Sequence, residues 1–333
     1  MGIFLWLGFI LFVLIMLALD LGVFNRKAHV ISTKEALRWT GLCIVLALIF
    51  NGFLYFAYER HLFGIGRDIG HTTGGKEAAA NFFQGYVLEM SLSLDNIFVI
   101  ALIFAYFGVP RLYQHRVLFW GILGALVMRG VMIAIGATLI RRFSWVIYVF
   151  GALLVFTAFK MLFAGEGKVE PDRNPLVRLA RRLYPVTSHF EGEKFFVRVN
   201  GRRAMTPMFA ALLVVESTDV LFAIDSIPAI FGITQDPFLV FTSNVFAILC
   251  LRSMYFALSG MIAYFYYLKY SLVALLFYIG VKMLISGIAH IPAMLSLGII
   301  LLLLSMGIIA SLFHKPPACA EPSSSQPADE VGL

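Results

Sequence analysis

The chain has 333 residues, of which 60% are hydrophobic and 14% are charged, and its mean hydropathy is +0.88. Soluble domains carry about a quarter charged residues, so this composition excludes an ordinary soluble protein and indicates a polytopic membrane protein. The net charge of +7 would suggest nucleic-acid binding in a soluble chain. In a membrane protein it instead reflects the Lys and Arg residues that cytoplasmic loops retain, so we expect no nucleic-acid partner.

Nine apolar runs are each long enough to cross a bilayer, which takes about 20 residues. The first run lacks a basic segment before it and a small-residue cleavage site after it, so we expect it to be a retained span rather than a signal peptide. The sequence predicts an all-α polytopic membrane protein with about nine transmembrane helices. The runs fall at 2–22, 38–58, 81–108, 116–140, 143–164, 206–232, 238–267, 270–290 and 292–313.

The distribution of basic residues predicts the orientation. If the N-terminus lies outside, most Lys and Arg residues outside the spans fall on the inner side, including nine between 166 and 205. Positive charge is retained on the cytoplasmic side of membranes. We therefore expect the N-terminus outside and the C-terminus in the cytoplasm.

Segment 166–205 is the only sizeable polar piece between spans, and we expect it to be a basic cytoplasmic linker. Asn174-Pro175 is a typical helix start, which predicts a short helix through Arg182. Asn200-Gly201 lies between two short strand-like runs, which predicts a hairpin with a type I′ turn. The linker's simplest role is to lie on the anionic inner surface of the membrane. The tail 314–333 is rich in Pro and Ser, and we expect it to be disordered.

The chain also contains an internal repeat. ALLVFTAFKMLFAG at 152–165 matches ALLFYIGVKMLISG at 274–287, and a mid-span arginine precedes each, Arg129 and Arg252. Each unit has a span with acidic residues, a span with an arginine and a span with Lys-Met. Because three is an odd number, the second unit would be upside down relative to the first. This predicts two inverted three-helix repeats that meet around a site at the membrane midplane. The expected divisions are two helices at 1–58, repeats at 81–165 and 206–290, and a last helix at 292–313.

Five carboxylates lie inside the predicted spans, in the stretches EMSLSLDNI at 89–97 and ESTDVLFAIDSIP at 216–228. A carboxylate at membrane depth costs about 2.5–3.5 kcal/mol on insertion scales, and such groups usually mark a cation or proton path. All-oxygen sites favour Mg²⁺, Ca²⁺ or Mn²⁺ over softer metals. We expect these carboxylates to form one metal site: Glu89, Asp95, Glu216, Asp219 and Asp225.

Nearby polar and basic residues could support such a site. Convergence of the acids is easier if the helices are irregular near Asp95 and Asp225, and Pro228 cannot bond the carbonyl of Ile224. The alternative is a purely structural network in which the acids pair with intramembrane bases, because such charges do pair. A mixed interpretation has the arginines hold the empty site and release the carboxylates to an arriving ion. The expected supporting residues are Asn96, Ser226, Arg129, Arg252 and Lys282, with the function of Lys160 and Lys282 left open.

Cysteine usage and the known catalytic motifs exclude several other functions. Cys43 and Cys250 fall in apolar runs and Cys319 in the tail, and no CxxC motif or Cys/His cluster indicates zinc or a redox pair. No phosphate-binding loop motif is present, which disfavours ATP-driven pumping by this chain. No nucleophile constellation is visible, so we expect no enzyme and no bound cofactor.

The segments SLSLDNIFVI, VVESTDVLFAIDSIPAIF and FFVRVNGRRAMTP resemble signature segments of the TerC/Alx family of bacterial integral membrane proteins. The resemblance runs from about Asp20 to His314 and is strongest to Alx-type members, which are associated with alkaline induction and manganese export. It implies an inner-membrane location and kinship with LysE-type exporters, which also use inverted three-helix repeats. The family's intramembrane acids fall on Glu89, Asp95, Glu216, Asp219 and Asp225.

The leading hypothesis is a secondary transporter that exports Mn²⁺ and exchanges it for protons. Exporting another cation, such as Ca²⁺ or a basic amino acid, is the closest alternative. A membrane scaffold that docks stress-response partners through segment 166–205 is a second alternative, and it predicts that the acids are dispensable. The sequence sets neither the direction of transport nor the oligomeric state.

Overall fold

The structure is a computed structural model that describes most of the chain. The described residues are 3–22, 32–66, 73–163, 190–199, 202–258, 268–288 and 291–313, with a few single residues between 178 and 187. The short helix expected at 175–182 falls largely outside these residues, and the tail 314–333 falls outside them entirely. Both remain predictions.

Every predicted apolar run contains a helix. In the described part of the chain these are α1 (Ile3–Gly22), α2 (Thr33–Glu59), α3 (Gly75–Phe107), α4 (Arg111–Arg142), α5 (Val146–Phe163), α7 (Pro207–Phe231), α8 (Pro237–Leu258), α9 (Leu268–Leu284) and α10 (Ala293–Phe313). A short 3₁₀ helix, η1, covers Leu62–Gly64, and two strands follow α5, β1 (Phe196–Val199) and β2 (Arg202–Met205).

Seven of these helices are long and apolar enough to cross a membrane: α2, α3, α4, α5, α7, α8 and α10. The apolar part of α1 is shorter, at Phe4–Leu19, and α9 has 17 residues. The structure therefore supports an all-α polytopic membrane protein, while the count of nine spans remains a prediction.

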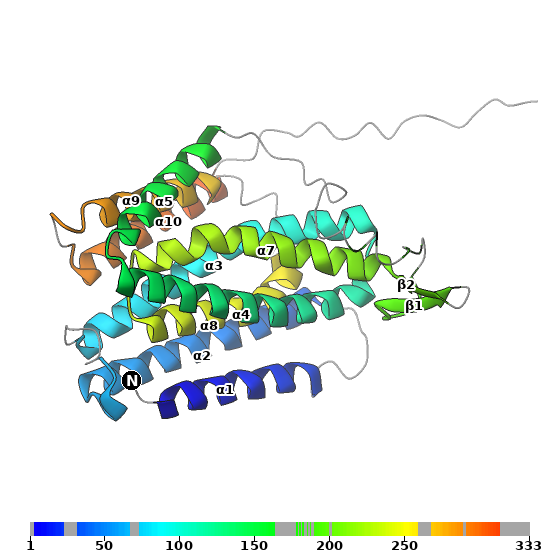
Figure 1. The fold of residues 1–333 in the computed structure, drawn as a ribbon, viewed down its shortest axis with the longest axis horizontal. Helices are drawn as coiled ribbons and strands as arrows, with labels where there is room; N and C mark the ends of the chain where they lie inside the picture. Colours follow the sequence, from blue (N-terminus) through cyan, green and yellow to red (C-terminus); the bar gives the residue numbers. More distant parts are fainter. Residues whose placement is uncertain are drawn as a thin grey trace, which may run out of the picture.

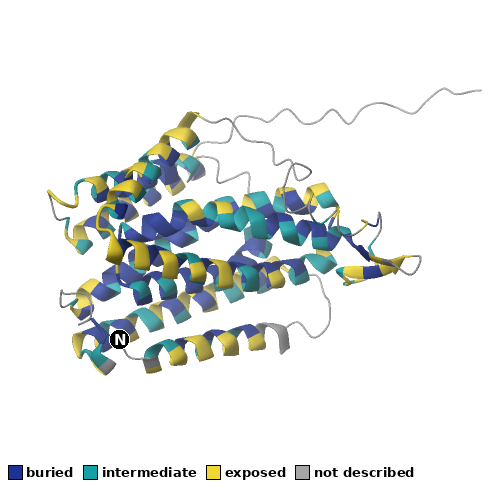
Figure 2. Cartoon of the chain, in the orientation of Figure 1, coloured by how far each residue is buried: buried dark blue, intermediate teal, exposed yellow. Residues whose placement is uncertain are grey.

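Helices α2, α3, α4, α7 and α8 form the central bundle, with α1 at one edge and α5, α9 and α10 grouped on the other side (Figure 1). Buried residues concentrate inside the bundle, whereas α1 turns many large apolar side chains outward (Figure 2). Exposed examples on α1 are Phe4, Leu7, Leu11 and Leu14. Such a surface suits lipid, because apolar side chains facing a bilayer incur no hydration cost.

Helices at corresponding places in the two predicted repeats lie side by side and run antiparallel. A Cβ on Gly85, near the start of α3, would lie 3.6 Å from Ile230, near the end of α7. Tyr255 near the end of α8 donates to Gln114 near the start of α4, over 3.1 Å. Gly151 on α5 and Gly280 on α9 let these two helices pack closely, as small residues do between membrane helices. Inverted repeats require these antiparallel pairs.

The hairpin lies at one end of the bundle (Figure 1). Strands β1 and β2 pair antiparallel with Val199 opposite Arg202, so the connection consists of two residues, 200 and 201. Thr206, just before α7, donates to the carbonyl of Lys194 over 2.9 Å. Arg116 on α4 forms an ion pair of 2.8 Å with Glu193. The hairpin is therefore fixed to the starts of α4 and α7.

The helix irregularity that would ease convergence of the five acids is absent near Asp95 and Asp225. Helix α3 continues through Asp95, and α7 continues through Asp225 and Pro228. Pro228 lies three residues before the end of α7 at Phe231, and the segment stays helical although proline cannot donate to the carbonyl of Ile224.

Candidate cation site

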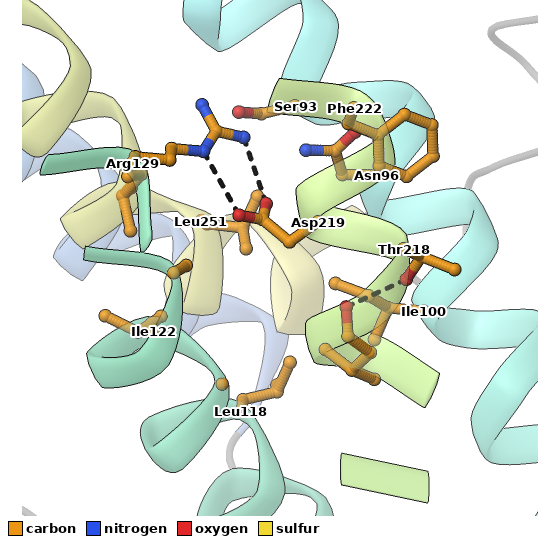
Figure 3. Close-up of a pocket in the computed structure, with 14 residues that line it drawn as sticks. Ser93, Asn96, Ile100, Leu118, Ile122, Arg129, Thr218, Asp219, Phe222 and Leu251 are labelled. Carbon is orange, nitrogen blue, oxygen red and sulfur yellow. Dashed lines mark hydrogen bonds and ion pairs between the residues drawn. The ribbon is translucent and has the colours of Figure 1, made fainter. Parts of the chain in front are cut away.

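Arg129 joins two carboxylates in the middle of the bundle. Its Nη1 donates to Oε2 of Glu89 over 2.7 Å, and its Nη2 and Nε donate to the two oxygens of Asp219 over 2.9 and 3.1 Å. The side chains of Arg129 and Glu89 are 3% and 1% exposed, and that of Asp219 is 15% exposed. Figure 3 shows Arg129 and Asp219 pointing toward each other across the pocket. Acids from both predicted repeats therefore share one guanidinium.

Asn244 on α8 completes the environment of Glu89. Its Nδ2 donates to Oε1 of Glu89 over 2.8 Å, and its Oδ1 lies 3.4 Å from Nη1 of Arg129. The hydroxyl of Ser226 also lies 3.4 Å from that nitrogen. Both Asn244 and Ser226 are buried. Four helices, α3, α4, α7 and α8, thus each contribute at least one polar side chain to a single network.

A small cavity adjoins this network. Its volume is about 20 Å³, which is room for about one water molecule. Arg129, Asp219, Asn96, Ser93 and Thr218 provide its polar lining (Figure 3). Within the described residues, Oδ1 of Asn96 is buried without a hydrogen-bond partner. A site with this many oxygen atoms has the ligand chemistry that hard cations prefer.

The cavity extends from Arg129 toward the end of the bundle that carries the hairpin. There its lining is apolar and includes Ile100, Leu118, Val215 and Leu251. These residues belong to a buried apolar cluster of α3, α4, α7 and α8. This end of the cavity is therefore lined by apolar side chains, and its volume of about 20 Å³ does not admit a hydrated cation.

The other three predicted acids lie apart from the Arg129 network. Glu216 packs its carboxylate against Gly124 on α4, where a Cβ would collide with it. Asp225 is half-buried and accepts a hydrogen bond of 2.9 Å from Thr157 on α5. Asp95 is half-buried on α3, next to Asn96, and does not line the cavity. Among the described residues, no three His, Cys, Asp or Glu side chains lie close enough together to hold a metal ion.

The predicted supporting bases also lie in different parts of the structure. Arg129 occupies the network, whereas Arg252 lines a second cavity, between α1, α2, α4 and α8. Lys282 on α9 donates to Ser296 on α10 over 3.3 Å. Sequence reasoning missed Asn244, although the polar triplet Thr242-Ser243-Asn244 inside an apolar run could have indicated it.

Another buried carboxylate, Asp236, lies outside the spanning helices, just before α8. It accepts a hydrogen bond of 2.6 Å from Tyr58 on α2 and one of 2.9 Å from the backbone N–H of Phe238. Burial raises the pKa of the Asp236 carboxyl above its ordinary value, and these hydrogen bonds offset part of the rise. Asp236 thus caps α8 and ties it to α2.

Comparisons with known proteins agree with this architecture. A family model described as "Integral membrane protein TerC family" matches residues 74–318. An uncharacterized membrane protein of Myxococcus xanthus is 48% identical over 320 residues, 95% of each chain. Proteins named "Putative membrane-bound redox modulator Alx" from Salmonella typhi and Escherichia coli K12 are each 45% identical over 307 residues. The aligned part covers 92% of this chain and 92% and 93% of theirs. No solved structure matches the chain.

Proposed function

Because the chain belongs to the integral membrane protein TerC family, we propose that it is a secondary transporter that exports a divalent cation, with Mn²⁺ as substrate and protons as the exchanged ion. It is an integral multi-pass membrane protein. The observation that carries the proposal is the Arg129 bridge between Glu89 and Asp219 where four helices meet. Buried charges in a membrane protein usually mark a transport path rather than add stability.

In the proposed cycle, the Arg129 guanidinium and the transported cation take turns in neutralising the two carboxylates. The guanidinium of Arg129 compensates the two carboxylates while no cation is present. A divalent cation brings two positive charges, so it can replace the guanidinium if Arg129 swings away. Asn244 and Ser226 would then offer neutral oxygens to the ion. Loss of the bridge would also free α4 to move against α3 and α7, which provides a reason for the cation to trigger opening.

The choice of cation rests on ligand chemistry and on the resemblance to Alx-type members. The described network contains carboxylate, amide and hydroxyl groups and no thiolate or imidazole, which favours a hard cation. This chemistry also suits Ca²⁺, and the two acids would suit a basic amino acid. The distribution of basic residues supports an orientation with the N-terminus outside, and the resemblance to Alx-type members supports an inner-membrane location.

Flux into proteoliposomes tests the proposal and separates these substrates. Purified protein would be reconstituted, and uptake of Mn²⁺, Ca²⁺ and lysine measured alongside a lumenal pH dye. We expect Mn²⁺ to move with proton movement in the opposite direction. If only Ca²⁺ or only lysine is transported, that cation replaces Mn²⁺ as the proposed substrate. No flux of any cation would overturn transport and favour the scaffold alternative, in which the acids are dispensable and segment 166–205 is required.

A redox role is the second candidate. Two of the relatives are named putative membrane-bound redox modulators. The observation in this chain that favours such a role is the contact between Cys43 and Cys250, whose thiols hydrogen bond across α2 and α8.

A further inference from the structure

Two buried thiols meet between α2 and α8. Cys43 and Cys250 are both reduced and buried, and they hydrogen bond to each other. The Cys250 sulfur also faces the carbonyl of Thr40, one turn before Cys43, at 4.0 Å. The residues are 207 positions apart, which is why no sequence motif predicts the pair. Sulfur atoms in hydrogen-bond contact need to close to about 2.05 Å to form a disulfide.

One of the two thiols lines the second cavity. This cavity has a volume of about 230 Å³ and lies behind the second half of α1. Its walls are mostly apolar, and they include Cys43, Trp39, Leu46 and Phe256. The cavity is large enough for a ring-sized molecule and lies among helices that face the bilayer. The ligand we expect in this cavity is therefore an apolar molecule dissolved in the membrane.

One charged side chain also lines this mostly apolar cavity. Arg252 is 7% exposed and lines the cavity on the same helix as Cys250. Arg252 lies six residues before Leu258, the last residue of α8. Its Cα is therefore about 9 Å from that helix end along the axis, at 1.5 Å per residue. A guanidinium can donate hydrogen bonds to a ligand oxygen.

We propose that Cys43 and Cys250 form a dithiol that a membrane quinone oxidises from this cavity. Two S–H bonds break and one S–S bond forms between the two sulfurs. The two electrons and two protons pass to the quinone, which leaves as quinol. Arg252 binds the quinone oxygen on which negative charge develops. This activity is separate from cation transport, because neither cysteine touches the Arg129 network.

A quinone fits these features better than a phospholipid does. A phospholipid headgroup would also pair with Arg252, but it would leave the adjacent thiol pair without a role. A quinone uses all three features at once: an apolar chamber, a hydrogen-bond donor and a two-electron reductant within reach. It also supplies the oxidant that a disulfide inside a membrane requires, since water-soluble oxidants do not enter this region.

The test uses the full chain in lipid nanodiscs, with Cys319→Ser so that only the two buried thiols can react. The protein is reduced, freed of reductant without oxygen and mixed with decylubiquinone. Loss of quinone absorbance measures quinol formation, and maleimide labelling after denaturation counts the remaining thiols by mass spectrometry. We expect one quinol per chain, loss of both thiols and a disulfide within one chain. Cys43→Ser and Cys250→Ser should each reduce quinol formation to the background.

Arg252→Gln tests the binding role. Its two thiols remain, and we expect quinone reduction to slow on the order of tenfold or more, as expected for a lost hydrogen bond from a charged group. Three results would overturn the proposal. The first is that excess quinone leaves both thiols reduced, and the second is that the disulfide joins two chains. The third is that native mass spectrometry finds a phospholipid that quinone does not displace.

Discussion

The guanidinium of Arg129 donates two hydrogen bonds to the carboxylate of Asp219, from Nε over 3.1 Å and from Nη2 over 2.9 Å. Its third nitrogen, Nη1, donates to Glu89. Such a bidentate contact fixes both partners in orientation as well as in charge. It links α4 to α7, and the Glu89 bond extends the link to α3. One side chain thus holds together three helices that the transport cycle would have to separate.

Removing this side chain should destabilise the protein. Arg129→Gln leaves Glu89 and Asp219 buried without their counter-charge, and breaking a buried ion pair typically costs about 3–5 kcal/mol. Thermal unfolding in detergent should therefore show a clearly lowered midpoint. Arg129→Gln combined with Asp219→Asn should recover part of the loss, because one of the two uncompensated charges is then gone. An unchanged midpoint in the single variant would show that the bridge has no structural role.

Asn244 should matter for cation affinity more than for folding. Asn244→Leu removes the amide that donates to Glu89 over 2.8 Å, and hydrogen bonds to charged groups contribute about 1.5–3 kcal/mol. We expect the half-saturating cation concentration to rise on the order of tenfold or more. Thr138→Ala is the matched control, because that hydroxyl is exposed and bonds only to its own helix. Equal affinity in both variants would exclude Asn244 from the site.

Gly151 allows α5 to pack closely against α9. A Cβ at this position would lie 2.9 Å from the backbone carbonyl of Gly280 and 3.0 Å from the Cβ of Met283, so Gly151→Ala should destabilise the protein by about 1–3 kcal/mol, as overpacking does. Gly52→Ala on α2 is the control, since a Cβ there meets nothing within 4 Å. If Gly151→Ala unfolds at the same temperature as Gly52→Ala, the packing is not as described.

Asp236 should make stability depend on pH in a specific direction. Burial raises the pKa of its carboxyl when the protein is folded, against about 3.9 when it is unfolded. The folded form then binds the proton more tightly, so this residue's contribution to stability increases as pH falls from neutral through the folded-state pKa. This change in stability ends when the pH has fallen below the pKa of the unfolded state. Tyr58, the backbone N–H groups of Phe238 and Leu239 and the charge of Arg141 act on the same carboxyl.

The check is the unfolding temperature between pH 4 and 8 for the wild type and Asp236→Asn. The amide still accepts from Tyr58 and can cap α8, but it does not titrate. The difference between the two proteins should therefore shift in favour of the wild type as the pH is lowered. A constant difference across this range would show that Asp236 does not contribute the predicted pH dependence.

The sequence located the charged residues of the network but not their partners. Charged groups are conspicuous in apolar runs, so Glu89, Asp219 and Arg129 were identified from composition alone. Which acid faces which base depends on helix rotation and crossing, and six-residue spacing does not determine these. Asn244, Gly124 and the Cys43–Cys250 contact therefore went unpredicted. Irregular helices would have eased convergence of the acids, but α7 continues through Pro228.

Cation flux through variants of the bridged acids tests the central claim most directly. Manganese uptake into proteoliposomes would be compared for wild type, Glu89→Gln, Asp219→Asn and the control Glu77→Gln, an exposed acid in the first turn of α3. The account predicts flux in the wild type and in Glu77→Gln, and loss of flux in both network variants with folded protein still present. Undiminished flux in Glu89→Gln and Asp219→Asn would contradict it and leave the two carboxylates as structural partners of Arg129.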